Sequence, residues 1–153
     1  MMLFNLEIGE FDNLIIMNPK LRVILAILAG IVAGGLLVGT LEMLLMQSPP
    51  ENLDLTDRVK MGEWIGSLPV TAFAILLLAY FFSSAVGGWV ANRISAPTKY
   101  RPALIVGFGL FVAGVMNVIA IPHPMWFSIS SSLIYLMGAW IGGKAANRTK
   151  MID

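Results

Sequence analysis

The sequence predicts an all-α membrane protein in which four transmembrane helices form one bundle, built as two helical hairpins repeated in parallel. Three observations support this fold class. Of the 153 residues, 58% are hydrophobic and 12% are charged, a composition that excludes a water-soluble globule. Four stretches reach the roughly 20 apolar residues needed to cross a bilayer. The second and fourth stretches also share a sequence pattern.

The first predicted hairpin contains spans at about 21–46 and 68–91, joined by an outer loop at 47–67. The first span is interrupted only by Arg22 at its start and Glu42 near its end. The second span has no charged residue and opens with Pro69, which fits the first helical turn because no backbone donor is lost there. The first span is too long for the 7 to 15 apolar residues of a secretory leader, so it is expected to be a permanent helix.

The second predicted hairpin contains spans at about 103–121 and 125–146. The first of these lies between Pro102 and Pro122, and the second follows Pro124. Because so few residues connect the two spans, they are expected to be antiparallel neighbours. All four spans belong to one transmembrane domain, residues 19–150.

Residues 1–18 are predicted to be an N-terminal extension of this domain. Their apolar residues are mixed with acidic ones rather than with the Lys and Arg that an anionic membrane surface favours. Two interpretations are open: a segment that lies at the interface or binds a partner, or an upstream start, with native translation beginning near Met17.

The distribution of Lys and Arg predicts that both termini are cytoplasmic, because cytoplasmic loops carry an excess of positive charge. Eight of the ten basic residues fall on the side of the termini. They are Lys20, Arg22, Arg93, Lys99, Arg101, Lys144, Arg148 and Lys150. The first outer loop has only Arg58 and Lys60, and the second has none. Arg93 and Arg148, at the ends of the second and fourth spans, are interpreted as anchors that meet the helix dipole and lipid phosphate.

An internal repeat relates the second and fourth spans at an interval of 55 residues. The shared pattern is Pro, ten residues, Tyr, six residues, Gly-Gly, two residues, Ala-Asn-Arg, and it starts at Pro69 and again at Pro124. Both halves start and end on the same side, so the repeats are parallel and related by an axis along the membrane normal. Tyr80 and Tyr135 become equivalent near mid-membrane, where each hydroxyl needs a partner. A hydrogen bond shared between them is expected.

Small residues at four-residue spacing occur in every span, as in Gly30 and Gly34, Gly35 and Gly39, and Gly138 and Gly142. Such pairs let helices approach closely in lipid. Packing within the bundle is the favoured interpretation, and a homodimer interface is the other.

Polar residues are predicted to gather near the outer face of the bundle. Glu42 is the one charge inside a span away from its start, at the outer edge of the hydrocarbon, and a charge inside a membrane marks function by default. Asn117 lies at nearly the same depth on the third span, and His123 lies in the outer turn. Ser131 belongs to a serine cluster in the outer half of the fourth span. These four residues form the candidate polar site.

The sequence gives no sign of a metal, cofactor, nucleic-acid or catalytic site. It has no cysteine and a single histidine, lacks metal-ligand spacing, and has a formal net charge of +1. A membrane enzyme using Glu42 and His123 as acid and base would lack a recognisable nucleophile. No enzymatic activity is therefore expected.

One resemblance is carried by a set of short motifs. They are Glu42 near the end of the first span, Ser48-Pro49-Pro50, Gly87-Gly88-Trp89-Val90-Ala91, Asn117 and Pro122-His123-Pro124-Met125-Trp126-Phe127. Over roughly residues 19–146 the chain resembles a group of small, uncharacterised bacterial four-helix inner-membrane proteins. The Pro-His-Pro-x-Trp-Phe turn is the most specific part. The resemblance implies a bacterial inner membrane and four helices, and no chemistry.

Two functions follow as hypotheses. The first is a non-catalytic accessory or assembly subunit, whose small-residue faces dock a second copy or a larger membrane partner. The second is a small dimeric transporter or channel with an outer-facing site of Glu42, Asn117 and His123. A water-filled cavity at Glu42 would favour transport, and a dry bundle with a local hydrogen bond to Glu42 would favour the accessory role.

Overall fold

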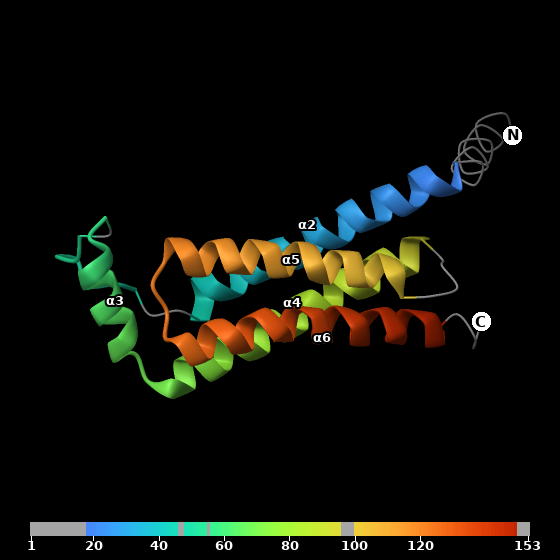
Figure 1. Cartoon of the computed structure of the whole chain (residues 1–153). Helices are drawn as coiled ribbons and strands as arrows, with labels where there is room; N and C mark the ends of the chain where they lie inside the picture. Colours follow the sequence, from blue (N-terminus) through green and yellow to red (C-terminus); the bar gives the residue numbers. More distant parts are fainter. Residues whose placement is uncertain (1–17, 46–47, 55, 96–99, 150–153) are drawn as a thin grey trace, which may run out of the picture.

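The computed structural model describes residues 18–45, 48–54, 56–95 and 100–149, without the side chains of 148 and 149. Within these ranges the chain forms five helices and no strand (Figure 1). They are α2 (Pro19–Leu45), α3 (Arg58–Ser67), α4 (Val70–Ser95), α5 (Arg101–Ala120) and α6 (Met125–Thr149). Of the predicted N-terminal extension, only Asn18 lies inside the described residues.

Four of the helices, α2, α4, α5 and α6, are long and apolar enough to cross a membrane. Even α5, the shortest with 20 residues, rises about 30 Å, the thickness of the hydrocarbon core. The protein is therefore a multi-pass integral membrane protein, and the predicted all-α bundle of four spanning helices is confirmed.

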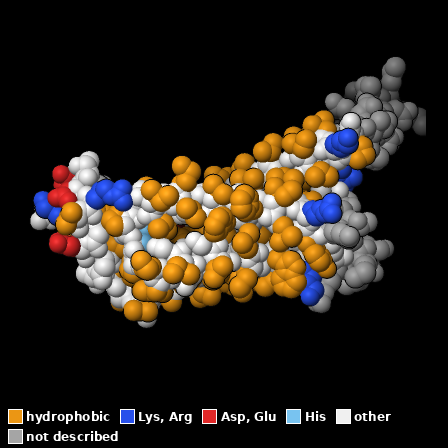
Figure 2. Space-filling model, in the orientation of Figure 1, with side chains coloured by type: hydrophobic (Ala, Val, Ile, Leu, Met, Phe, Trp, Pro, Cys, Tyr) orange, Lys and Arg blue, Asp and Glu red, His pale blue; other side chains and the backbone are white. Residues whose placement is uncertain are grey.

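On the face seen in Figure 2, charged side chains lie at the two ends of the bundle, with an apolar belt between them. Glu42, which lines a cavity between the helices, belongs to neither group. At the end where α2 and α5 begin, the charged residues with described side chains are all basic. They are Lys20, Arg22, Arg93, Arg101 and Lys144. The opposite end, around α3, carries both signs, and its acidic residues are Glu51, Asp54, Asp57 and Glu63. We call these the basic end and the mixed end.

The two helices of the repeat, α4 and α6, pack side by side in parallel and in the register of the repeat. The rings of Tyr80 and Tyr135 stack, with centroids 5.2 Å apart and planes at 18°. Nearer the basic end, Asn92 Nδ2 donates to Asn147 Oδ1 at 3.3 Å, again between residues 55 apart. Both contacts join equivalent positions of the 55-residue pattern, so the predicted parallel arrangement of these two helices is confirmed. The other two helices are placed less symmetrically, because α4 contacts α5 whereas α2 does not contact α6.

The α4–α6 seam changes character along its length. Toward the mixed end it is aromatic, where Phe73 and Phe127 meet with centroids 5.0 Å apart. Toward the basic end the backbones touch through glycines, so that a Cβ on Gly142 would lie 1.9 Å from the Ala85 carbonyl oxygen. Because lipid supplies little drive for helix association, this close approach and its van der Waals contacts hold the seam together.

Helices α2 and α5 pack around the α4–α6 pair and complete the bundle. Both pack against α4 and against each other, α6 packs against α4 and α5, and α2 does not contact α6. Gly30 on α2 faces the carbonyl oxygen of Gly87 and the side chain of Val106. Gly34 faces Leu110 in the same way. These two glycines pack within the bundle, which is the favoured interpretation of their spacing.

Helix α3 lies within the connection at 47–67, a short helix that the sequence did not predict. Asp57 caps this helix by accepting hydrogen bonds from the backbone N–H groups of Val59 and Lys60. The hydrogen bond from the Lys60 backbone N–H holds the pKa of Asp57 below its usual value. The stabilisation by this charged cap is therefore complete above the usual pKa and is lost as the pH falls through the lowered pKa. Ile65 is buried in the core cluster. The helix lies across the mixed end of the bundle (Figure 1).

Candidate functional site

Glu42 and Tyr80 form the central contact of the candidate site. Side chains on a helix tilt toward its N-terminus. Helices α2 and α4 run in opposite directions, so Glu42 is directed from the mixed end toward mid-membrane and Tyr80 is directed the opposite way. The two meet, and the Tyr80 hydroxyl donates a hydrogen bond to Glu42 Oε1. The carboxylate is half-buried and Tyr80 is buried.

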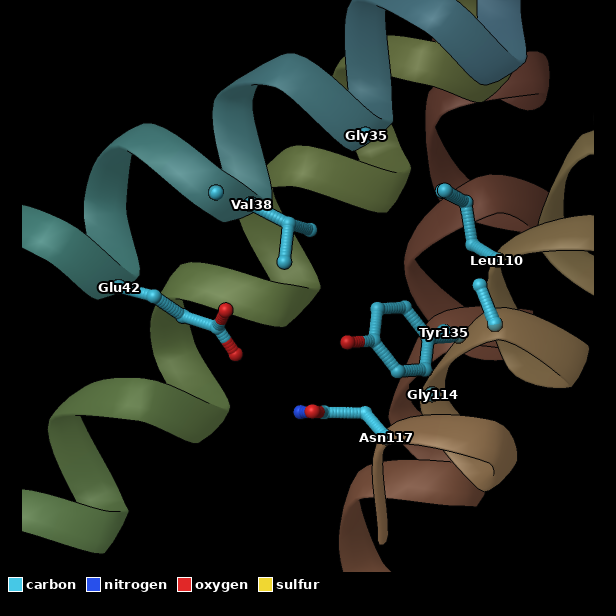
Figure 3. A pocket seen from close by; sticks show the side chains of 9 residues that line it. Gly35, Val38, Glu42, Leu110, Gly114, Asn117 and Tyr135 are labelled. Carbon is cyan, nitrogen blue, oxygen red and sulfur yellow. The ribbon is translucent and has the colours of Figure 1, made fainter. Parts of the chain in front are cut away.

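The mid-membrane tyrosine pair differs from the prediction. Tyr80 and Tyr135 are adjacent, as expected, but their contact is a ring stack and not a shared hydrogen bond. The Tyr80 hydroxyl takes Glu42 as its acceptor, while the Tyr135 hydroxyl points into a cavity (Figure 3).

This cavity, of about 240 Å³, lies between α2 and α5 in the half of the bundle nearer the mixed end. Its lining consists of Gly35, Val38, Gly39, Glu42, Leu110, Ala113, Gly114, Asn117 and Tyr135. The contact between Gly34 and Leu110 closes it toward the basic end. Beyond that contact α2 leaves α5, and a Cβ on Gly35 or Gly39 would meet nothing within 4 Å.

Three polar side chains converge in the cavity from three helices: Glu42 from α2, Asn117 from α5 and Tyr135 from α6 (Figure 3). Within the described residues, neither the Asn117 amide nor the Tyr135 hydroxyl has a hydrogen-bond partner. None of the lining residues is basic. The cavity therefore presents one carboxylate and two neutral groups whose hydrogen-bonding capacity is unused.

Of the four predicted site residues, the structure brings Glu42 and Asn117 together, and His123 and Ser131 lie outside the cavity lining. The His123 Nδ1 is 2.8 Å from the Ile121 carbonyl oxygen, to which it donates, and the ring stacks on Phe127. Ser131 is buried and its hydroxyl donates to the Ser128 carbonyl oxygen at 3.1 Å. Both side chains serve local structure. The sequence predicted that both residues lie at about the depth of Glu42, but it could not predict the direction in which their side chains point.

Two arginines have a structural role that the sequence analysis missed. Arg22 Nε donates to the Ile94 carbonyl oxygen at 2.7 Å, at the C-terminal end of α4. Arg58 Nη2 donates to the Ile119 carbonyl oxygen at 2.8 Å, at the C-terminal end of α5. Each places a cation on the unpaired carbonyls and negative dipole of a helix end. These pairs could not be predicted from the sequence, because the two partners lie 72 and 61 residues apart along the chain.

The predicted anchors Arg93 and Arg148 lie in the last turns of α4 and α6, at the basic end. Arg93 is half-buried, and the side chain of Arg148 lies outside the described residues. Their contact with lipid phosphate stays a prediction.

The chain matches no protein-family model, no curated protein and no solved structure. The site is therefore interpreted from its own chemistry. Among the described residues there is no group of three or more His, Cys, Asp or Glu side chains that could hold a metal ion. The resemblance carried by the Pro-His-Pro-x-Trp-Phe turn stays a prediction.

Two further grooves differ from the Glu42 cavity in polarity. One, of about 390 Å³, lies between α5 and α6 and is lined by apolar side chains with Ser128 and Ser132. The hydroxyls of both serines donate to carbonyl oxygens of α6 or of the turn before it. The other, of about 310 Å³, lies between α4 and α6 and has only apolar side chains and a glycine. Neither groove contains an ionisable group.

Proposed function

We propose that the protein is a small transporter or channel of the bacterial inner membrane that binds a cation at Glu42. The observation that carries this proposal is a half-buried carboxylate facing a cavity with no basic residue in its lining. An ionised group inside a bilayer is unfavourable, by about 2.5–3.5 kcal/mol at the centre on insertion scales. A bound cation would offset that cost, so the site is suited to positive ligands.

The position of the cavity supports a transport function. It lies between α2 of the first hairpin and α5 of the second, and transporters built from repeats bind their substrates at the repeat interface. The inner half of the α2–α5 contact is closed by Gly30 and Gly34 against Val106 and Leu110. Transport would therefore require this contact to open.

The charge distribution supports an orientation with both termini in the cytoplasm, because the basic end would then face inward. The mixed end, with α3 and the cavity, would face outward. We expect a cysteine introduced at the exposed Asn52 to react with a membrane-impermeant thiol reagent in intact cells. The native chain has no cysteine and is the background control. If the cysteine is labelled only after the cells are opened, the mixed end faces the cytoplasm and the proposed orientation is wrong.

The function is tested by Glu42→Gln, which removes the charge and keeps the shape. Proteoliposomes would be loaded with gradients of protons, sodium or methylammonium, and the decay of each gradient followed. We expect one of them to decay through the native protein and to slow at least about tenfold in the variant, since a charge-assisted contact is lost.

The matched control is Glu63→Gln, on the exposed surface of α3, which should leave the flux unchanged. Thermal unfolding temperatures close to that of the native protein would show that both variants remain folded. If no gradient decays faster than in empty liposomes, or if Glu42→Gln equals the native protein, cation transport at this site is wrong.

A second candidate is the non-catalytic accessory or assembly subunit, favoured by a different observation. Gly35 and Gly39 lie four residues apart on α2, and a Cβ on either would meet nothing within 4 Å. This small-residue face, which also forms one wall of the Glu42 cavity, suits close approach by a helix of a second copy or a larger membrane partner. If this candidate is right, the chain purified in mild detergent associates with a second copy or a partner, and the Glu42→Gln variant associates equally well. No flux that depends on Glu42 should then be detected.

A further inference from the structure

The polar groups of the Glu42 cavity match a particular kind of cation. Tyr80 occupies Glu42 Oε1, which leaves Oε2 as an acceptor. The amide oxygen of Asn117 and the hydroxyl oxygen of Tyr135 are two more, and all three side chains point into the same space (Figure 3). A primary ammonium group has three N–H donors and no acceptor. Three oxygen acceptors around one anionic charge suit this group.

The size and remaining lining of the cavity favour a ligand larger than a bare ion. Water takes about 30 Å³ per molecule in the liquid, so a cavity of about 240 Å³ has room for a ligand of several heavy atoms. Beside the polar groups its walls are apolar, with Val38, Leu110 and Ala113. A bound proton or sodium ion has no apolar group that could contact these walls.

The rings at the site favour N–H donation over a quaternary ammonium. Quaternary ammonium groups are bound by open aromatic faces. Tyr135 stacks one face on Tyr80, and its edge lies against Gly114, where a Cβ would be 2.6 Å from the ring. The ring therefore offers its hydroxyl to the cavity rather than an open face.

We propose that the Glu42 cavity binds a primary ammonium group attached to a short apolar body. The inference rests on the cation binding proposed above and names its ligand class. Glu42 accepts the charged group, while Asn117 and Tyr135 orient it. Glu42 lies three residues before the end of α2, about 4.5 Å of helix rise, so the ammonium has two possible sources: a free amine, or the ethanolamine headgroup of a phospholipid.

The test measures binding to the full chain purified in an amine-free detergent. Isothermal titration would compare propylammonium, tetramethylammonium and sodium chlorides. We expect saturable binding of propylammonium, at least about tenfold weaker binding of the other two, and loss of binding in Glu42→Gln. Asn117→Leu and Tyr135→Phe each remove one acceptor and should weaken the binding of propylammonium by a few-fold.

A steric variant tests the cavity itself. Gly39→Leu would fill space that is empty beside Gly39 and should abolish propylammonium binding with Glu42 intact. Gly66→Leu, at a glycine of α3 that also has open space beside it, is the matched control and should bind normally.

The source of the ammonium is decided by lipid retention. The chain would be extracted from vesicles of equal phosphatidylethanolamine and phosphatidylcholine, and the retained lipid counted by mass spectrometry. Enrichment of phosphatidylethanolamine that propylammonium displaces and Glu42→Gln abolishes assigns the site to the lipid headgroup. If both lipids are retained equally while propylammonium still binds, the site is assigned to a free amine.

Two results would overturn the inference, and they can be told apart. If sodium or tetramethylammonium binds as tightly as propylammonium in a Glu42-dependent way, the ligand class is wrong and cation binding stands. If Glu42→Gln binds every probe like the native protein, both the ligand class and the proposed function are wrong.

Discussion

Gly142→Ala is expected to lower the free energy of unfolding by about 1–3 kcal/mol, the usual cost of overpacking a close contact. The new Cβ would lie 1.9 Å from the Ala85 carbonyl oxygen and 2.9 Å from its Cα. Both atoms belong to the α4 backbone, so no side-chain rotation relieves the clash, and α4 and α6 must move apart. The measurement is unfolding by sodium dodecyl sulfate in mixed micelles, followed by tryptophan fluorescence.

The matched control is Gly35→Ala, in the spanning helix α2. A Cβ there would meet nothing within 4 Å, and alanine is about 0.8–1.0 kcal/mol better than glycine in a helix. This variant should be as stable as the native protein or slightly more so. Equal stability of Gly142→Ala and Gly35→Ala would show that α4 and α6 do not meet through Gly142.

Asn92→Leu should destabilise the chain by about 1–3 kcal/mol, because it leaves buried polar partners without their hydrogen bonds. Asn92 is fully buried. Its Nδ2 donates to the Gly143 carbonyl oxygen at 3.2 Å, and its Oδ1 accepts from the Ala103 N–H at 3.1 Å. That N–H belongs to the first turn of α5, where the backbone N–H groups have no carbonyl partner within their own helix. One side chain of α4 thus ties together α5 and α6.

The Asn92 effect would be measured as a shift in the temperature of thermal unfolding, with Asn52→Leu as the control at an exposed residue between α2 and α3. We expect a clear decrease for Asn92→Leu and none for Asn52→Leu. An Asn92→Leu variant with native stability would contradict the role assigned to these hydrogen bonds.

The spans and the in-register repeat were predictable because both follow from linear features of the sequence. An apolar stretch of sufficient length must become a helix in lipid, since each backbone group needs an internal partner. The repeat placed Tyr80 beside Tyr135 because equivalent residues of parallel hairpins lie at one depth. Helix α3 was missed because its 10 residues are too polar to suggest a span, although Asp57 before it is a signal for an N-cap.

The candidate site was only partly predictable, because position along a spanning helix gives depth but not direction around the helix axis. Glu42 and Asn117 face one cavity, whereas His123 and Ser131 at similar depth point elsewhere. Tyr135 was predicted as half of a structural pair, and its role in lining the cavity emerges only from three-dimensional packing. The crossing of α2 over α5 opens the cavity, and nothing in the local sequence of either helix specifies it.

The two hairpins contribute unequally to the Glu42 cavity, with a consequence for the charge that the cavity can hold. Glu42 reaches it from the first hairpin, whereas Asn117 and Tyr135 reach it from the second. Residues 98–152 contain no Asp or Glu, so the second hairpin has no acidic counterpart of Glu42. A second carboxylate in the same space would repel the first. With a single carboxylate, one monovalent ligand is enough to make the occupied site neutral.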